Sequence, residues 1–511
     1  MARATAPPYV ARATDVWALG ITMLLGGQFV SLSAGLAAGT VSFGLAIILM
    51  GLAYLCFAWS LAEVTSAVPF AGGSYGLARC TLGFYAGFLV GCCDILEYII
   101  FTSLGCVLLG QMLVSKWEWL DPYQPLIWLV NLVIPLAIAI RGGHLYWRVN
   151  FGSAILLLVV VFFYFFSAMT AASLTEYSGG AEFACVGGFA SFFTALPQAA
   201  SLFSGVEGLT TFSKMVSQPQ RHISKGQLAS MGTLFFTAVS MYLLALSLPP
   251  GAQKLYLEAS VLNGGFALSF NISEASAVLF SAPSMIACVP TAAMVASNIL
   301  AAMATSKLFP PRLGKIHRRF HTPDQAILFV GVLSYALCFP VLYARQVVAL
   351  LFNLSLVFAF TTYLAQCVGY VYLNLHLTRL DRLQTSPVGI PGVIFAAFVF
   401  GASLVSILFC QNDDFVALAV STILFIILSM YYHFVAKFRQ QVSRDEQRLL
   451  FFANISKQRQ SEHRWRYRHR QMVNWGHFWH GSVSTTMHTI LPFTSPRSTR
   501  NIRVVVVQKK K

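Results

Sequence analysis

Long apolar runs of about 20 residues or more recur along the whole chain and restrict what it can fold into. The hydrocarbon core of a bilayer is about 30 Å thick, and a helix needs about 20 apolar residues to cross it. Only 10% of the 511 residues are charged, whereas soluble domains carry about 25%. The sequence therefore predicts an all-α integral membrane protein with about twelve spans, at residues 16–38, 42–66, 83–113, 124–140, 150–174, 189–212, 227–249, 276–304, 325–345, 347–374, 391–410 and 415–436.

The distribution of Lys and Arg predicts the orientation. If the N-terminus is cytoplasmic, only Lys116, Lys254 and Arg345 of the 34 Lys and Arg residues fall in outside segments. Positive charge accumulates on the cytoplasmic side of membrane proteins. We therefore expect a multi-pass protein, located in the plasma membrane, with both termini in the cytoplasm. Its expected parts are an N-terminal segment 1–15, a twelve-helix domain 16–436 and a basic tail 437–511.

Small residues interrupt two of the apolar runs. Gly26-Gly27 lie near the middle of the first run, and Ser204-Gly205 lie in the sixth. In transporters built from two inverted repeats, substrate binds at the bilayer midplane between broken helices, and the amides freed there favour an anion. Glycine can instead allow close helix packing. We predict a five-plus-five inverted-repeat core with broken helices 1 and 6.

Four carboxylates fall inside the predicted spans, and no Lys or Arg lies at mid-span to neutralise them: Glu63, Asp94, Glu97 and Glu207. Ionisable groups at membrane depth cost about 2.5–3.5 kcal/mol and tend to mark functional sites. Glu207, next to the sixth-span break, is the first candidate for proton coupling or for binding a substrate ammonium. Asp94 and Glu97 share a helix face and could bind an amine or share a proton. Alternatively, one of them hydrogen-bonds a neighbouring helix.

Three motifs occur in order within residues 15–436. An acid, a proline and a Gly-Gly-x-Tyr turn precede a D-I-L-E-Y segment; an F-x-G-x-E motif in the sixth span is followed by a basic proline loop; and a basic loop ending in Thr-Pro precedes the ninth span. The residues are Glu63, Pro69, Gly72, Gly73, Tyr75, Arg79 and Asp94–Tyr98; Phe203, Gly205, Glu207, Pro219, Gln220, Arg221, Ile223 and Gly226; and Thr322 and Pro323. These motifs resemble those of the amino acid–polyamine–organocation (APC) superfamily, and the D-I-L-E-Y segment resembles the branch containing ethanolamine permeases and related amino acid permeases.

The resemblance implies a secondary active transporter, a symporter that moves amino acids or a related small amine such as ethanolamine. The sequence favours protons as the coupling ion and leaves sodium open. Glu63 is expected to form a cytoplasmic gate contact with Arg79 or with another inside-loop cation. A transporter-like nutrient receptor or scaffold that signals through the basic tail is the alternative. The expected substrate-binding residues are Gly26, Gly27, Gln28, Asp94, Glu97, Phe203, Ser204, Gly205 and Glu207.

Other features bear on enzymatic activity, modification and partners. All eleven His residues fall in loops, at span ends or in the tail, so we expect no enzyme, no cofactor and no metal site. Asn271 begins a glycosylation sequon in an outside loop. In the tail, the Trp465–Trp479 segment predicts a basic amphipathic helix on anionic lipid; a disordered tail and RNA binding are the alternatives, and no nucleic-acid partner is expected. The oligomeric state is not predicted.

Overall fold

The computed structural model describes residues 9–70, 72–168, 172–344, 346–376, 382–411, 413–442 and 447. The chain divides into a unit of residues 1–456 and a second unit of residues 457–511. The second unit, with nearly all of the predicted tail, lies outside the described residues. The described residues are helical and form no strand; one isolated bridge joins Ala11 to Val216.

Eleven helices among the described residues are long and apolar enough to cross a membrane, which agrees with a multi-pass membrane protein. The main helices are α1 (Ala13–Gly35), α2 (Thr40–Ala67), α4 (Phe84–Lys116), α5 (Gln124–Arg141), α6 (Gly143–Ala168), α8 (Gly188–Ala200), α9 (Pro219–Ala245), α13 (Ala282–Thr305), α14 (Asp324–Cys338), α16 (Val347–His376), α17 (Gly389–Phe409) and α18 (Val416–Tyr431). Shorter helices connect them: α3 (Ser74–Thr81), α7 (Leu174–Tyr177), α10 (Ala252–Leu255), α11 (Asn263–Phe270), α12 (Glu274–Ala277), α15 (Pro340–Tyr343) and α19 (Lys437–Arg439).

The sixth predicted span is broken, as expected. Helix α8 ends at Ala200, and residues 201–205 form a turn before a 3-10 helix, Val206–Lys214. Gly205 has a φ of 122°, a conformation that glycine adopts without steric cost. The break interrupts the apolar run, so this span is not among the eleven unbroken helices.

The first helix is continuous, and the prediction that it breaks at Gly26-Gly27 is wrong. Helix α1 runs without interruption from Ala13 to Gly35. A Cβ atom at Gly26 would lie 2.9 Å from Oγ of Ser284, and one at Gly27 would lie 3.0 Å from the carbonyl oxygen of Ser201. The two glycines therefore allow α13 and the α8 turn to approach α1 closely. Their small size, not their backbone freedom, explains the pair.

The basic loop expected after the sixth span is shorter than the sequence predicts. Helix α9 begins at Pro219, so Arg221 and Lys225 lie in its first turns and not in a loop. Proline suits the first position of a helix because its missing N–H group has no intrahelical partner there. The fifth span likewise begins earlier than expected, at Gly143.

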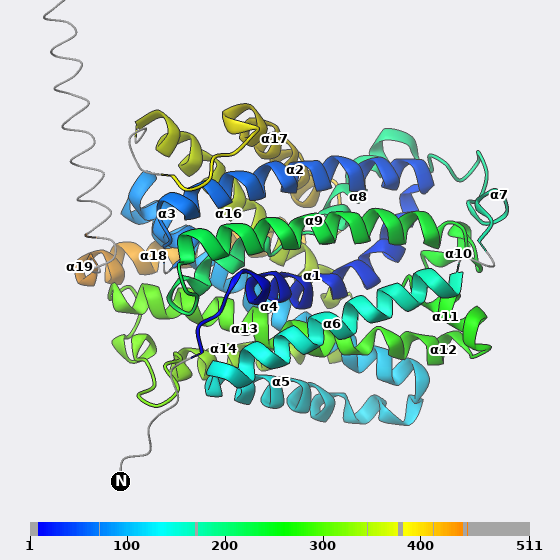
Figure 1. The fold of residues 1–511 in the computed structure, drawn as a ribbon, viewed down its shortest axis with the longest axis horizontal. Coiled ribbons are helices and arrows are strands. Elements are labelled where there is room, and N and C mark those ends of the chain that lie inside the picture. Colours follow the sequence, from blue (N-terminus) through cyan, green and yellow to red (C-terminus); the bar gives the residue numbers. More distant parts are fainter. Residues whose placement is uncertain are drawn as a thin grey trace, which may run out of the picture. The chain divides into compact units, whose positions relative to one another are not determined.

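Helices α1 and α4 form the centre of this unit. Helix α1 packs against α6, α8, α9 and α13, and α4 packs against α13 and α16. In the apolar stretch of α4, 83% of the residues are buried, against 11% for α18, so α18 is peripheral. The helices run side by side, with α3 and α19 at one end and α7, α10 and α11 at the other (Figure 1).

Both described ends of the chain contact the same end of the helices. Near the N-terminus, the backbone N–H of Ser217 donates to the carbonyl of Ala11 (3.0 Å). Near the C-terminus, the backbone N–H of Gln441 donates to the carbonyl of Ser306 (2.9 Å). A chain with an even number of membrane spans has both termini on the same side of the membrane. We call this end the terminal end of the bundle.

The close packing of α1 on α9 yields a test. A Cβ atom at Gly20 would lie 2.6 Å from Cβ of Ser230 on α9. We expect Gly20→Val to lower the free energy of unfolding by about 1–3 kcal/mol, as overpacking does, measured by thermal unfolding in detergent. Gly152→Val is the control, because Gly152 is exposed on α6 with no neighbouring atom within 4 Å. Equal stability of the two variants would contradict the assigned packing.

Candidate functional site

A cavity of about 410 Å³ lies between α1, α4, α13, α16 and the turn after α8. Its size falls within the range of small-molecule sites, about 300–1,000 Å³. Four predicted site residues line it: Gly26, Gly27, Glu97 and Ser204. The rest of the lining is not among the predicted residues and includes Met23, Val30, Ser31, Phe101, Leu104, Leu108, Gln198, Ser201, Met285, Cys288, Phe352, Asn353, Ser355 and Gln411.

The cavity extends from the protein surface to the middle of the bundle. Ala34 and Ala349 line it and are exposed, whereas Glu97 and Ser204 line it and are buried. Ala34 lies near the end of α1 and Ala349 near the start of α16. The mouth therefore faces away from the terminal end, and Glu97 and Ser204 form the floor.

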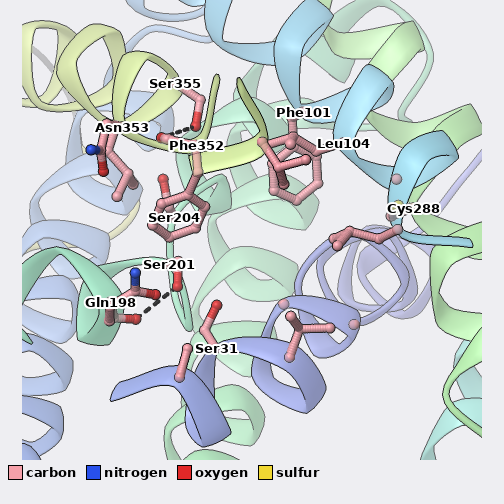
Figure 2. Close-up of a pocket in the computed structure, with 18 of the residues that line it drawn as sticks. Ser31, Phe101, Leu104, Gln198, Ser201, Ser204, Cys288, Phe352, Asn353 and Ser355 are labelled. Carbon is pink, nitrogen blue, oxygen red and sulfur yellow. Dashed lines mark hydrogen bonds between the residues drawn. The ribbon is translucent and has the colours of Figure 1, made fainter. Parts of the chain in front are cut away.

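The two walls of the cavity differ in chemistry. Figure 2 shows Gln198, Ser201 and Asn353 on one side and Phe101, Leu104 and Cys288 on the other. The first set comes from α8, its following turn and α16, and the second from α4 and α13. A mostly apolar pocket with a few polar groups on one side is typical of a small-molecule site.

Glu97 presents a carboxylate oxygen that has no partner. Tyr363 Oη lies 3.4 Å from Oε1 of Glu97 and donates to it, and Tyr363 also contacts Ser204 Oγ at 2.8 Å. Oε2 of Glu97 has no hydrogen-bond partner among the described residues, although the side chain is only 3% exposed. An unsatisfied buried polar group costs about 1–3 kcal/mol, and more when charged. The floor of the cavity is therefore suited to a ligand that donates hydrogen bonds.

Glu207 has a different environment, although it is equally buried. Tyr98 Oη donates to its Oε1 (2.5 Å), and the backbone N–H of Gly205 donates to its Oε2 (3.2 Å). Glu207 and Gly205 do not line the cavity. The carboxylate of Glu207 instead caps the turn after α8 by accepting from the amide that the break exposes.

Asp94 lies on the same helix face as Glu97 but faces a different element. The hydroxyl of Ser74 donates to Oδ2 of Asp94, and Oδ1 has no partner among the described residues. Ser74 begins α3, directly after the Gly-Gly turn. Asp94 does not line the cavity, so the structure separates the predicted pair: Glu97 faces the cavity and Asp94 holds α3.

Gln28 and Phe203 position the elements around the cavity and do not line it. The amide of Gln28 donates to the carbonyls of Leu234 (2.8 Å) and Leu202 (3.3 Å), which ties α1 to α9 and to the turn after α8. The ring of Phe203 packs against Tyr54, with ring centroids 5.8 Å apart. Both side chains are buried among protein groups.

An ion pair between the buried Glu63 and the partly exposed Arg382 lies at the terminal end. Glu63 pairs with Arg382 and also accepts hydrogen bonds from Tyr370 Oη (2.7 Å) and the backbone N–H of Ser386 (2.9 Å). The sequence predicts that Glu63 contacts either Arg79 or another cation of an inside loop. The structure shows the second alternative, because the partner of Glu63 is Arg382. The guanidinium of Arg79 contacts Tyr75 Oη, the ring of Phe84 (4.8 Å to the centroid) and the carbonyl of Gln441 (3.2 Å).

Two further predictions concern modification and metal binding. Asn271 is exposed and directly follows α11, and its glycosylation stays a prediction. Within the described ranges, no group of three His, Cys, Asp or Glu side chains is arranged to hold a metal ion.

Sequence reasoning missed Tyr363, Arg382 and the polar wall. Tyr363 lies in an apolar run like many other aromatic residues, and only its contacts with Glu97 and Ser204 distinguish it. Asn353 carried a usable signal, because an amide near the start of an apolar span is costly unless it faces a cavity or a partner.

The chain is similar to membrane transporters. A family model described as amino acid permease matches residues 15–430. An uncharacterized transporter of Rhizobium meliloti (strain 1021) is 26% identical over 345 residues, which cover 62% of this chain and 69% of the relative. The methylthioribose transporter of Bacillus subtilis (strain 168) is 26% identical over 353 residues, which cover 63% of this chain and 73% of the relative.

The ion pair at the terminal end yields a second test. We expect Glu63→Gln and Arg382→Gln each to lower the free energy of unfolding by about 1–3 kcal/mol, because a buried polar group loses its charged partner. The double variant should lose less than the sum of the two, as coupled residues do. Thermal unfolding measures all three, with Arg312→Gln at an exposed position as the control. Additive losses would show that the two side chains do not interact.

Proposed function

The chain belongs to the amino acid permease family, and from this premise we propose that it is a secondary active transporter of amino acids, or of a related small amine such as ethanolamine, coupled to protons. The protein is a multi-pass membrane transporter and not an enzyme. The substrate, the coupling ion and the location in the plasma membrane belong to the proposal.

The observation that carries the proposal is a cavity open at one end and closed at the other. Its mouth lies at Ala34 and Ala349, and its floor is formed by Glu97 and Ser204. The Glu63–Arg382 pair ties α2 to the segment before α17 at the terminal end. Alternating access requires such one-sided states, in which a central site communicates with one side at a time. With cytoplasmic termini, as the Lys and Arg distribution favours, this state opens to the outside.

Glu207 is the proposed proton-coupling residue. Its carboxylate holds the turn after α8 through Gly205, and the same turn supplies Ser204 to the cavity floor. Protonation would remove the negative charge that accepts from the Gly205 amide and from Tyr98. A proton on Glu207 would thus loosen the turn that forms the floor. This arrangement links protonation to the shape of the site.

The substrate is the less constrained part of the proposal. The Bacillus subtilis relative is named for methylthioribose, so similarity at this level does not determine what the present chain carries. The polar and apolar walls suit a small amphipathic molecule, and the carboxylate at the floor suits one with an amino group. Amino acids and simple amines share this group.

Uptake by the purified protein tests the proposal. In proteoliposomes with a pH gradient, acidic on the side of the cavity mouth, we expect a labelled amino acid or ethanolamine to accumulate. A protonophore should abolish the accumulation, since the gradient drives it. Protein-free liposomes are the control. If no amino acid or amine moves under any gradient, the transport proposal fails and a receptor or scaffold role becomes the better interpretation.

Glu207→Gln tests the coupling residue separately. The amide keeps the size of the side chain but cannot bind and release a proton at ordinary pH. We expect accumulation driven by the pH gradient to fall at least tenfold, while exchange of substrate between the two sides without a gradient persists. Glu118→Gln, at an exposed position, is the matched control. If Glu207→Gln leaves both uptake and its pH dependence intact, the role assigned to Glu207 is wrong.

A further inference from the structure

Resting on the proposed transport function, we infer that the substrate is an amine without a carboxylate, with an apolar body of moderate size, and not an α-amino acid. The inference comes from the hydrogen-bond donors and charges around the cavity. A transported amino acid needs groups that hold its carboxylate as well as a group that holds its ammonium. Around the described cavity the second kind is a carboxylate, Glu97, whereas the first kind is limited to uncharged donors at Ser31, Gln198 and Asn353.

Helix α1 offers no free amides to a substrate carboxylate. Unwound helix ends hold anions because their backbone N–H groups lack intrahelical partners. Helix α1 continues through Gly26 and Gly27 to Gly35, so the N–H groups beside the cavity remain in the helical pattern. The carbonyl of Ser201 also lies against Gly27, and a carbonyl oxygen repels a carboxylate.

The turn after α8 also has few amides available for a substrate carboxylate, because four of its backbone N–H groups already donate to acceptors in the protein. Its last amide, that of Gly205, donates to the carboxylate of Glu207, so a protein anion occupies the position a substrate anion would take. The four bonds are Ser201 N–H to the Pro197 carbonyl (3.2 Å), Phe203 N–H and Ser204 N–H to the Ala200 carbonyl (both 3.0 Å), and Gly205 N–H to Glu207 Oε2 (3.2 Å).

The hydroxyl groups near the floor are also engaged. Ser201 Oγ donates to the carbonyl of Gln198 (2.7 Å) and Ser355 Oγ to that of Phe352 (2.8 Å), as the dashed lines in Figure 2 mark. Ser204 Oγ and Tyr363 Oη contact each other at 2.8 Å, so one of their two protons lies between them, and Tyr363 Oη also lies 3.4 Å from Oε1 of Glu97. Ser201 and Ser355 therefore have no proton left for a substrate carboxylate, and Ser204 and Tyr363 have at most one between them.

The charges around the cavity also oppose an anion. No Lys, Arg or His is among the described residues that line it, and Glu97 is the only carboxylic acid among them. Ser31, Gln198 and Asn353 also line the cavity; they can donate hydrogen bonds to a carboxylate, but they are uncharged and cannot neutralise it. An anion at the floor would meet Glu97 without a compensating cation.

An ammonium group satisfies what the floor lacks. It donates up to three hydrogen bonds, and Oε2 of Glu97 is a buried acceptor without a partner among the described residues. Beyond the floor, the apolar wall formed by α4 and α13 suits a hydrocarbon or aromatic body. The wall residues are Phe101, Leu104, Leu108, Met285 and Cys288.

Matched pairs of ligands that differ only by a carboxylate test the inference. The pairs are 2-phenylethylamine and phenylalanine, 3-methylbutylamine and leucine, and ethanolamine and serine. Binding to the purified full chain is measured by competition against labelled 2-phenylethylamine and by thermal shift, and uptake is measured in proteoliposomes. We expect the amine of each pair to bind at least tenfold more tightly than the amino acid, and the two larger amines to bind more tightly than ethanolamine.

The outcomes separate this inference from the proposed function. If the amino acids bind and move as well as their amines or better, the inference is overturned while the transport proposal stands. If neither member of any pair binds or moves, both are overturned. Glu97→Gln should weaken binding of 2-phenylethylamine at least tenfold, and Glu97→Asp, which keeps the charge, should weaken it less. The paired-ligand measurement on the unmodified chain remains decisive if a variant does not fold.

Discussion

The cap that Glu207 places on the broken helix is the interaction on which the rest of the site depends. A helix interrupted inside a membrane exposes amides that lipid cannot satisfy. Here the exposed amide of Gly205 donates to a carboxylate two residues further along the chain, and Tyr98 from α4 donates to the same carboxylate. One side chain thus satisfies the break and ties it to the central helix. The turn it stabilises places Ser204 at the cavity floor, beside the hydroxyl of Tyr363.

Glu207 and Glu97, the two carboxylates nearest the break, therefore differ in their contacts, although both are glutamates and both are buried. Glu207 has both oxygens bound by protein groups, whereas Glu97 has one oxygen that no described group binds. A buried polar atom without a partner is destabilising, and a ligand that supplies a donor removes that cost. The capped acid is suited to shaping the site, and the uncapped acid is suited to binding a ligand. Asp94, one turn away from Glu97, does neither and instead holds the start of α3.

Sequence patterns predicted the fold better than the site, for physical reasons that particular residues illustrate. Apolar runs report burial in lipid directly, so the spans and the break at Gly205 could be predicted. Gly26-Gly27 could not be interpreted from the sequence, because a glycine that unwinds a helix and a glycine that admits a neighbouring helix look the same; the Ser284 and Ser201 contacts decide between them. The partner of Glu63 was equally hidden, since Arg382 is separated from it by most of the chain. Sequence patterns predict local structure such as helices and breaks, whereas a binding site is formed by residues that lie far apart in the sequence.

A continuous first helix changes what the broken sixth helix can do. Two facing breaks would offer two sets of amides, one available for a cap and the other for a ligand. With α1 intact, the only broken span next to the described cavity is the one that Glu207 already caps. Among the described residues the floor then lacks a second anion-binding backbone site, while the carboxylate of Glu97 remains there. Because recognition by backbone depends on which groups a helix leaves unpaired, the intact α1 shifts the preference of the floor from anions towards cations. The Gly26-Gly27 pair thus admits α13 and the α8 turn against a helix that stays intact.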